Sequence, residues 1–364
     1  RPDAQALIDA GNTNVASPAM VWGNPEIEDD VTIFANVGLD LGDDKEFYMW
    51  GNYSDRTGTG GYYYRNPQDR GGVFTDGNGD LLVGAMDGNA AACPNLPILE
   101  ADVRNQADYQ AVAADDNCWA FNELFPGGYT PQFTGEINDL SLVMGTKGDI
   151  KSGFMEDVFY DISGSVGRNK STYTLVNTVN PSMGANQPLD NSFEAGSYIQ
   201  LEKAFNLDLV KGVDLGLEDD VNVAGGFEWR QESFEIISGE QASWEQGPLA
   251  TQGFSVGSHG FAGFSPESQG ISKRQNIAAY VDVEAQVTES LLLGAAVRYE
   301  DYSSFGDTTN YKLTAQFALT DDLSLRASHS TGFRAPTVGQ ANVVNTQTSL
   351  VNGELVQSAT YPPT

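Results

Sequence analysis

The sequence predicts an all-β fold: the wall of an antiparallel transmembrane β-barrel, of about ten strands, with long extracellular loops. Three observations predict it. Apolar and polar residues alternate through four consecutive segments within residues 275–330, which is the period of a β-strand. Turns of only a few residues join the segments, so neighbouring strands run antiparallel. The segments are roughly 11 residues or longer, enough for a tilted strand to cross a bilayer, whereas strands of soluble proteins usually have about 5–6 residues.

The apolar face of these segments carries no Lys, Arg, Asp or Glu, and His329 near one strand end is its single titratable residue. In the first segment the face consists of Ile277, Ala279, Val281, Val283, Ala285 and Val287. Arg or Lys facing lipid at the midplane costs about 2–4 kcal/mol, so the pattern favours contact with hydrocarbon. A soluble secreted β-sandwich or propeller, carbohydrate-binding or hydrolytic, is the alternative, and it would place this face against a second sheet.

Ahead of these segments the chain alternates between strands and loops. Asn and Pro break the periodicity of residues 8–30, which indicates a loop. The strands that we expect next are 31–40, 46–55, 137–147, 154–168, 193–206 and 221–237. We expect three outer loops: one of roughly eighty residues after the second strand, one at 181–191 and one at 238–273. We also expect an inner connection at 207–220 that is longer than the other inner turns. Short turns on one side and long loops on the other are typical of outer-membrane barrels.

The composition argues against several classes of protein. A formal charge of −31 argues against nucleic-acid binding, which needs a basic surface, and it mildly disfavours a strongly anionic ligand. No apolar run is long enough for a membrane-spanning helix. Arg1 is not an initiator, no signal peptide is recognisable, and residues 359–364 are polar and proline-rich, so we expect a fragment of a longer protein.

The only two cysteines, Cys93 and Cys118, both fall in the long loop that follows the second expected strand. An even count and a closed loop of moderate size predict a disulfide, formed in an oxidising compartment such as the periplasm or the cell surface. Such a closure stabilises a protein by about 3 kcal/mol. Two unpaired buried thiols are the alternative. Metal binding has no support, because neither a CxxC pair nor a nearby His accompanies these cysteines.

One short motif resembles the nucleophile motif of hydrolases and another resembles the start of a calcium-binding loop, but each lacks the further residues or elements that such a site needs. Residues 253–257 fit the G-x-S-x-G pattern around Ser255, but their flanks are glycine-rich loop instead of the strand and helix of a nucleophile elbow. Residues 76–80 begin like a calcium loop, but Leu81 and Asp87 stand where an EF-hand needs Gly and Glu. We therefore expect the glycines of 253–257 to shape a loop and residues 76–80 to form a hairpin tip. We expect no enzyme activity, catalytic residue, cofactor or metal.

Aromatic side chains gather in three segments of the expected outer loops. Rings beside an arginine stack on a ligand and hydrogen-bond to it, so these segments are the candidates for ligand contact. The alternative is that the rings pack the loops or form the aromatic girdle of the membrane interface. The candidates are Tyr62, Tyr63, Tyr64 and Arg65; Trp119, Phe121 and Tyr129; and Trp244, His259, Phe261 and Phe264.

Residues 330–340 read Ser-Thr-Gly-Phe-Arg-Ala-Pro-Thr-Val-Gly-Gln. This segment resembles the STGFRAP-type signature of TonB-dependent outer-membrane receptors, in which it follows a barrel strand and opens an extracellular loop. Residues 292–302 resemble the Arg-Tyr-Glu-Asp-Tyr strand of that family, and residues 222–230 resemble its Gly-Glu-x-Arg strand. The resemblance extends more weakly back to Ile8. The motif residues are Gly332, Phe333, Arg334, Ala335 and Pro336.

The resemblance implies active transport across the bacterial outer membrane. Receptors of this family capture a scarce ligand (a ferric siderophore, haem, cobalamin, or a carbohydrate or peptide), and an inner-membrane TonB complex drives its passage. Residues 1–364 would be a fragment of the barrel domain, with the plug domain and the barrel C-terminus absent. The implied partners are the TonB complex through the missing plug, outer-membrane lipid and lipopolysaccharide, and a small-molecule or oligosaccharide ligand. A passive porin, which needs no plug, is a further alternative.

The polar face of the four segments would line the barrel lumen. In members of the family this wall contacts the plug, so the resemblance implies salt bridges across the barrel or to the plug in preference to ligand contact. The residues concerned are Tyr280, Asp282, Arg298, Glu300 and Arg326.

Overall fold

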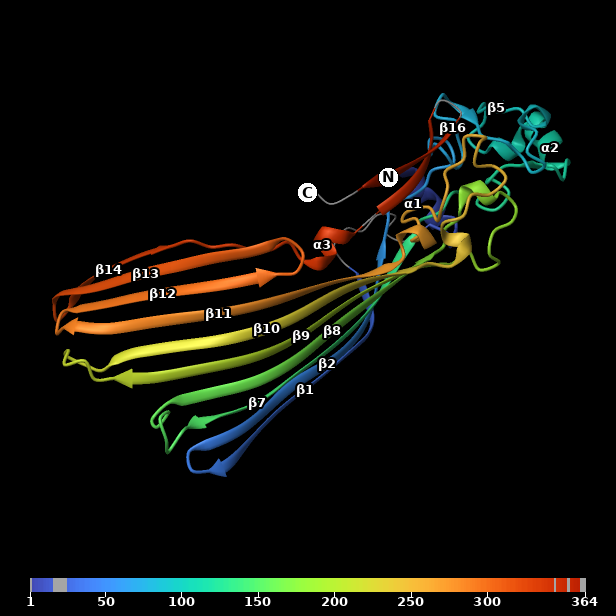
Figure 1. Cartoon of the computed structure of the whole chain (residues 1–364). Helices are drawn as coiled ribbons and strands as arrows, with labels where there is room; N and C mark the ends of the chain where they lie inside the picture. The colour runs from blue at the N-terminus through green and yellow to red at the C-terminus, as the bar shows by residue number, and fades with distance from the viewer. Residues whose placement is uncertain (1, 16–24, 344, 352–353, 361–364) are drawn as a thin grey trace.

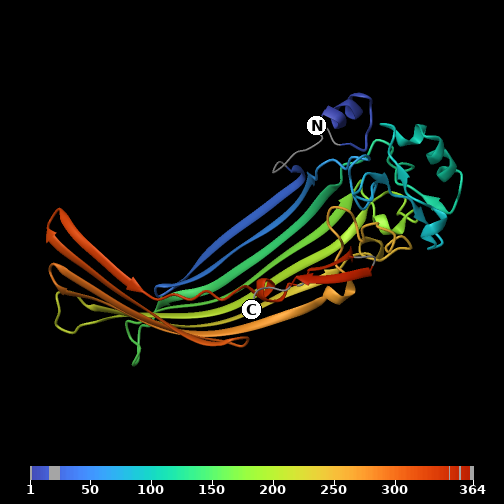
Figure 2. The same ribbon diagram turned by 90° about the horizontal axis from the view of Figure 1, so that it is seen from above.

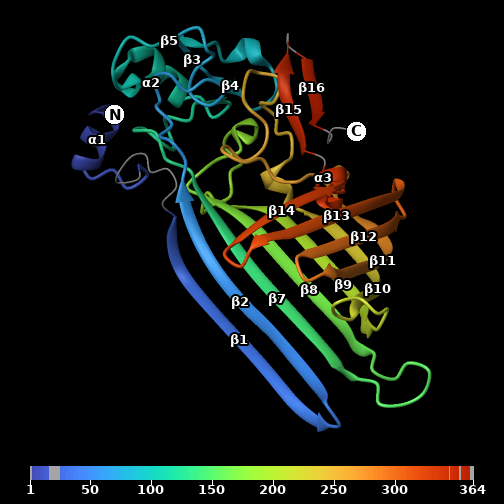
Figure 3. The same ribbon diagram turned by 90° about the vertical axis from the view of Figure 1, so that its left-hand side faces the viewer.

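The computed structural model describes residues 2–15, 25–343, 345–351 and 354–360. Its main feature is a ten-stranded antiparallel sheet, which confirms the all-β prediction. The strands, in spatial order, are β1 (Glu26–Gly42), β2 (Lys45–Gly61), β7 (Gln132–Asp149), β8 (Phe159–Val176), β9 (Phe193–Val213), β10 (Val221–Ser238), β11 (Gly270–Thr288), β12 (Leu291–Tyr302), β13 (Gly306–Thr320) and β14 (Leu323–Ser330). The sheet is curved, so that β13 and β14 come round in front of β8 to β10 in Figure 3.

The strands are long enough to cross a bilayer and continue beyond it. β9 has 21 residues and β7 pairs with β8 over its whole length without a shift in register, while a membrane crossing needs about 9–11 residues. Most strands also begin earlier or end later than the sequence pattern predicts, because the alternation weakens where a strand leaves the apolar layer.

Two boundaries predicted from the sequence are wrong. Phe154 does not begin a strand: it is 97% exposed in a turn that Asp157 closes with a positive φ of 64°, and β8 starts only after it. The long inner connection expected over 207–220 is also shorter, since β9 continues to its end at Val213 and leaves only 214–220. Asp208, which falls within the expected connection, instead lies on the inner face of β9, where it accepts a hydrogen bond from Tyr280.

The apolar face of the sheet is uncovered. Val281, Val297 and Leu313 on β11, β12 and β13 are 55%, 51% and 52% exposed. Within the described ranges the other sheets are three two-stranded ones: β3 (Asp80–Leu81) with β5 (Leu96–Pro97), β4 (Gly84–Ala85) with β6 (Cys118–Trp119), and β15 (Asn345–Val351) with β16 (Glu354–Thr360). None of them covers this face, as a second layer of a sandwich would.

The opposite, inner face carries polar contacts that reach across a strand. The hydroxyl of Tyr280 on β11 donates to Asp208 Oδ1 on β9 at 2.6 Å, over Gly226 of the intervening β10. A Cβ at Gly226 would lie only 2.6 Å from the same oxygen, so glycine is what lets the tyrosine lie flat there. A similar contact is made by Tyr48, which lies over Gly145 and donates to Asp161 Oδ1 at 2.6 Å, although Asp161 is two residues along β8 from the partner of Gly145.

The long connections gather at one end of the sheet, and most of the short turns lie at the other (Figures 1 and 2). This outer end includes α1 (Pro2–Asp9) and α2 (Ala107–Ala113), neither of which the sequence pattern predicted. A third helix, α3 (Val338–Asn342), lies against β10 and β11. No helix in the described part of the chain has both the length and the apolar character of a membrane span.

Candidate ligand-binding site in the outer loops

Three outer loops, residues 62–131, 177–192 and 239–269, share one buried core. Because its side chains come from all three loops, the core fixes their relative positions. Its members are Val73, Phe74, Leu82, Phe121, Phe125, Tyr129, Val179, Leu249 and Phe254.

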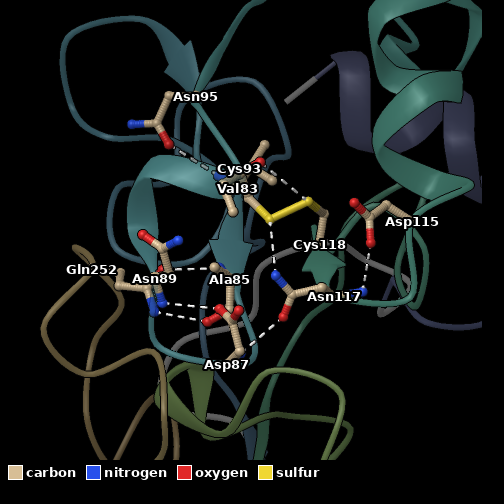
Figure 4. Close-up of a disulfide and its surroundings, with 11 residues drawn as sticks. Val83, Ala85, Asp87, Asn89, Cys93, Asn95, Asp115, Asn117, Cys118 and Gln252 are labelled. Atoms are coloured by element: carbon tan, nitrogen blue, oxygen red, sulfur yellow. Dashed lines mark hydrogen bonds between the residues drawn. A yellow bond between two sulfur atoms is a disulfide. The ribbon is translucent and has the colours of Figure 1, made fainter.

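The predicted disulfide is present and holds a second, adjoining core. Cys93 and Cys118 are bonded, with their Cα atoms 5.5 Å apart. Figure 4 shows the bond beside β4, whose Ala85 pairs with Cys118. Gln252 of the third outer loop accepts a hydrogen bond from the Ala85 amide at 2.8 Å and donates one to its carbonyl at 2.9 Å. The disulfide region is thereby joined to the loop that carries His259.

Arg65 lies in the interior of this loop cluster. A two-way backbone pairing with Tyr129 positions it, since the Arg65 amide donates to the Tyr129 carbonyl at 2.8 Å. Its side chain lies over the ring of Tyr63, with 4.2 Å between the guanidinium carbon and the ring centroid. Only 2% of the residue is exposed, and in the described part of the chain its Nε and Nη1 atoms have no hydrogen-bond acceptor.

Arg70 is held by a neutral histidine. Its Nε and Nη2 donate to His259 Nε2 at 3.1 and 2.7 Å, and its Nη1 donates to the Tyr63 hydroxyl at 3.2 Å. Because a guanidinium cannot accept a hydrogen bond, His259 Nε2 carries no proton. The ring is therefore the neutral Nδ1–H tautomer, and it donates to the Tyr129 hydroxyl at 2.7 Å.

The electrostatics of the cluster are those of two positive charges among neutral groups. Burial, together with the two arginines, holds the pKa of His259 well below 6.5. Burial also lowers the pKa of Arg65, and the nearby Arg70 charge adds to the effect. Burial raises the pKa of Tyr63, but Arg70 and Arg65 outweigh it and lower the pKa overall. The lowered pKa of Tyr63 shows that the positive charges of the two arginines favour its ionised form.

The structure brings part of the predicted aromatic set together. Tyr63, Arg65, Tyr129 and His259 belong to one contact network, and Tyr62 joins it with its ring 5.8 Å from the Arg65 guanidinium carbon. Tyr64, Phe121, Tyr129 and Phe264 are buried and pack the loops. Trp119 and Trp244 are half-buried and lie apart from the arginines, Trp119 against Phe121 and Trp244 with its Nε1 donating to the Gly239 carbonyl at 3.1 Å.

Phe261 and Phe264 of the third outer loop pack against aromatic side chains on the inner face of the sheet. Phe264 stacks on Tyr198 of β9 with 4.6 Å between ring centroids. Phe261 lies edge-on to Phe133 of β7 at 5.4 Å, and Phe133 stacks on Tyr173 of β8 at 5.3 Å. In the described part of the chain, aromatic side chains of the third loop and of β7 to β9 therefore pack together at the outer end of the polar face.

Sequence reasoning missed Arg70. Its only signal is its place among the three basic residues of an acidic loop, with Arg65 and Arg104. The pairing of Arg70 with His259 joins residues 189 positions apart in the chain, and no local pattern reports such a contact.

The predicted lumen residues lie together on the inner face. Arg298 Nη2 on β12 is 3.0 Å from Glu300 Oε1 and 3.3 Å from Glu228 Oε2 on β10, while Tyr280 bonds to Asp208. Asp282 shares this face on β11 by its register, and so does Arg326 on the exposed β14.

The residues of the 330–340 motif cross from β14 back to β10. Phe333 packs on Phe305 with 5.6 Å between ring centroids, and the Pro336 carbonyl accepts from Arg274 Nη1 at 2.6 Å. Arg274 also forms a buried ion pair with Glu232, at 2.6 Å, which the sequence did not predict. Gly332 and Arg334 are exposed, and Ala335 is half-buried.

The two remaining motifs have structural roles. The Ser255 amide donates to the Gly72 carbonyl at 2.9 Å, and both ring nitrogens of His259 are engaged elsewhere. The Asp76 carboxylate accepts from the amides of Asn78 and Asp80 at 2.8 and 3.2 Å, which forms a hairpin tip. Among the described residues, no group of three His, Cys, Asp or Glu side chains is arranged to hold a metal.

A groove of about 650 Å³ runs between α1 with the residues after it and the first outer loop. Its polar lining consists largely of carboxamides and one ion pair: Asn12, Asn14, Asn66, Gln68, and Asp102 with Arg104.

Comparison with known proteins agrees with this architecture. A family model described as TonB dependent receptor-like, beta-barrel, matches residues 22–357. A search of the curated proteins finds no match.

Several solved structures are similar. The RagAB peptide transporter is 12% identical, with a TM-score of 0.50 over 91% of this chain and 36% of its own. The siderophore receptor PirA from Acinetobacter baumannii is 13% identical, with a TM-score of 0.49 over 93% of this chain and 38% of that one. A variant of the ferric enterobactin receptor PfeA from Pseudomonas aeruginosa is 12% identical, with a TM-score of 0.46, over 88% and 35%. This chain thus spans less than two fifths of these proteins, and at such identities the likeness shows the fold alone.

Proposed function

This chain belongs to the family of TonB-dependent receptor β-barrels, which lie in the bacterial outer membrane, and on that premise we propose that it takes up a scarce ligand with TonB-supplied energy. One observation carries the proposal. An uncovered apolar face on the outside is combined with a polar inner face, whose outer end is filled by loops that share a buried core. That combination suits a gated receptor better than a wide aqueous pore.

The ligand-contacting residues in this proposal come from the loops that converge on Arg65. Tyr62, Tyr63, Arg65 and His259 form the centre of the candidate site, and Trp119 and Trp244 are peripheral candidates. Ligands named for similar structures, namely siderophores and peptides, are both candidates for this chain, as are haem, cobalamin and carbohydrates. Family members are transporters, and we propose no covalent chemistry.

The proposed partners are a TonB complex acting through a plug, the lipid and lipopolysaccharide around the barrel, and the ligand itself. The half-buried ion pairs of Arg298 with Glu228 and Glu300 are the contacts that we assign to the inner wall, facing a plug.

Uptake in cells tests this function. Radiolabelled or fluorescent candidates (a ferric siderophore, haem, cobalamin, an oligosaccharide and a peptide) are supplied to cells that express the receptor containing this chain, with and without TonB. We expect uptake of one class, and its loss when TonB is deleted or the inner membrane is uncoupled. Uptake that continues without TonB would identify a passive porin instead. Recovery of the protein in the soluble fraction without detergent would favour a secreted sandwich.

A further inference from the structure

Among the described residues, two arginine side chains of the outer loops, Arg65 and Arg70, lie against Tyr63 without an acidic partner. Within the described ranges, no carboxylate lies within ion-pair distance of Arg65 or Arg70, although the loop that contains them is acidic. Arg104 of the same loop shows the ordinary arrangement: its Nη2 lies 2.7 Å from Asp102 Oδ2.

This arrangement is costly for the empty protein. Arg65 is almost completely buried, and two of its guanidinium nitrogens, Nε and Nη1, have no acceptor among the described residues. Burying a guanidinium without a counter-ion or full hydrogen bonding is unfavourable, so such a side chain gains from an anion that supplies both. Among the described residues, the side chains that contact the two guanidinium groups are neutral: Tyr62, Tyr63 and His259.

The pair is reachable from solvent through Tyr63. Both guanidinium groups lie against its ring, at 4.2 Å for Arg65 and 5.7 Å for Arg70. Tyr63 is 38% exposed and Arg70 is half-buried, so the hydroxyl of Tyr63 and the edge of Arg70 form the outer rim. Neutral His259 holds Arg70 from the buried side and fixes the direction in which its remaining donors point.

We propose that Arg65, Arg70 and Tyr63 form an anion-binding subsite, which takes a carboxylate or phosphate group of the transported ligand. The inference rests on the proposed transport function and names the ligand class: a molecule with at least one anionic oxygen group. Arg70 donates directly to the anion at the rim, Tyr63 adds its hydroxyl, and Arg65 contributes its charge and free N–H groups from beneath. The net charge of −31 argues against such a ligand only on average, because the field at this point is set by two nearby cations.

Anion binding to the purified full-length receptor in detergent tests the subsite. Sodium phosphate and sodium citrate are titrated separately by calorimetry, with sodium chloride keeping the ionic strength constant. We expect the native receptor to bind at least one of them, and Arg70→Gln to weaken that binding about tenfold or more, as expected for loss of a charge-assisted hydrogen bond. Citrate alone would indicate a carboxylate ligand and phosphate alone a phosphorylated one, and each supports the subsite.

Arg104→Gln is the matched control, because it removes one positive charge from the same loop at an ion-paired position. It should bind the anions as the native receptor does. Equal weakening in both variants, or no difference between the native receptor and Arg70→Gln, would overturn the proposal. Arg70→Gln is preferred to Arg65→Gln because Arg70 is only half-buried. The measurement needs no TonB, so anion binding without TonB-dependent uptake would refute the transport function and leave the subsite standing.

Discussion

His259 connects more of the outer loops than any other single residue described above. Its ring joins Arg70 and Tyr129 of the first loop, while its amide donates to the Val179 carbonyl at 2.7 Å and its carbonyl accepts from Thr178 Oγ1 at 2.6 Å. These contacts use both ring nitrogens in the neutral form. The network therefore depends on a histidine that stays unprotonated in the folded state.

This dependence predicts a loss of stability in mild acid. The pKa of His259 lies well below 6.5 in the folded protein, whereas the unfolded chain binds the proton near pH 6.5. The contribution of His259 is thus complete above about pH 6.5 and is lost as the pH falls further, by at most about 1.4 kcal/mol per pH unit. The apparent melting temperature should fall between about pH 7.5 and 5.5, and should fall less in His259→Gln. Parallel curves for both proteins would contradict this account.

At the scale of elements, the buried pair of Arg274 and Glu232 fastens the segment after β14 onto β10 and β11. We expect Arg274→Met to destabilise the protein by about 3–5 kcal/mol, because Glu232 is left as an unpaired buried charge. The double variant Arg274→Met with Glu232→Leu should recover much of that loss. Urea-unfolding midpoints give the comparison. If the single and double variants are equally unstable, the ion pair matters less than the hydrogen bond to the Pro336 carbonyl.

Glycines under tyrosines on the inner face give a second prediction. A Cβ at Gly226 would displace the ring of Tyr280 and crowd Asp208, so Gly226→Ala should destabilise the sheet by about 1–3 kcal/mol. Gly167 of β8 has open space around it, and Gly167→Ala is the matched control that should change little. Heat-induced shifts in electrophoretic mobility measure both. An equal effect of the two substitutions would show that the tyrosine packing is not responsible.

The whole molecule is organised by the contrast between its two faces. Val281 points outward and Gln286 of the same strand points inward, by the alternation of β11. Val281→Arg should cost about 2–4 kcal/mol and reduce assembly in the membrane, because a charge then faces hydrocarbon. Gln286→Arg should assemble normally. Membrane fractionation of the two variants tests the assignment, and normal assembly of Val281→Arg would mean that this face meets water or protein.

The sequence predicted the sheet well because its two faces have opposite polarity along most of its length, most clearly in β11 to β14. It failed where that contrast is weak: Phe154 is apolar but lies in a turn, and Asp208 is charged but lies within β9. The disulfide followed from the even number of cysteines and the moderate size of the loop between them. The arrangement of the outer loops did not, since the contact of Arg70 with His259 depends on how three irregular segments pack. Only part of the predicted aromatic set lies in one network, and nothing in the sequence pointed to Arg70 or to the burial of Phe121 and Tyr129.

The core that the outer loops share has a consequence for how this end of the molecule opens. Val73, Val179 and Phe254, one from each loop, are all buried in it. Pulling out one loop alone would expose apolar surface on the other two, at about 25 cal/mol per Å². We therefore expect the three loops to separate from this core together and not one at a time.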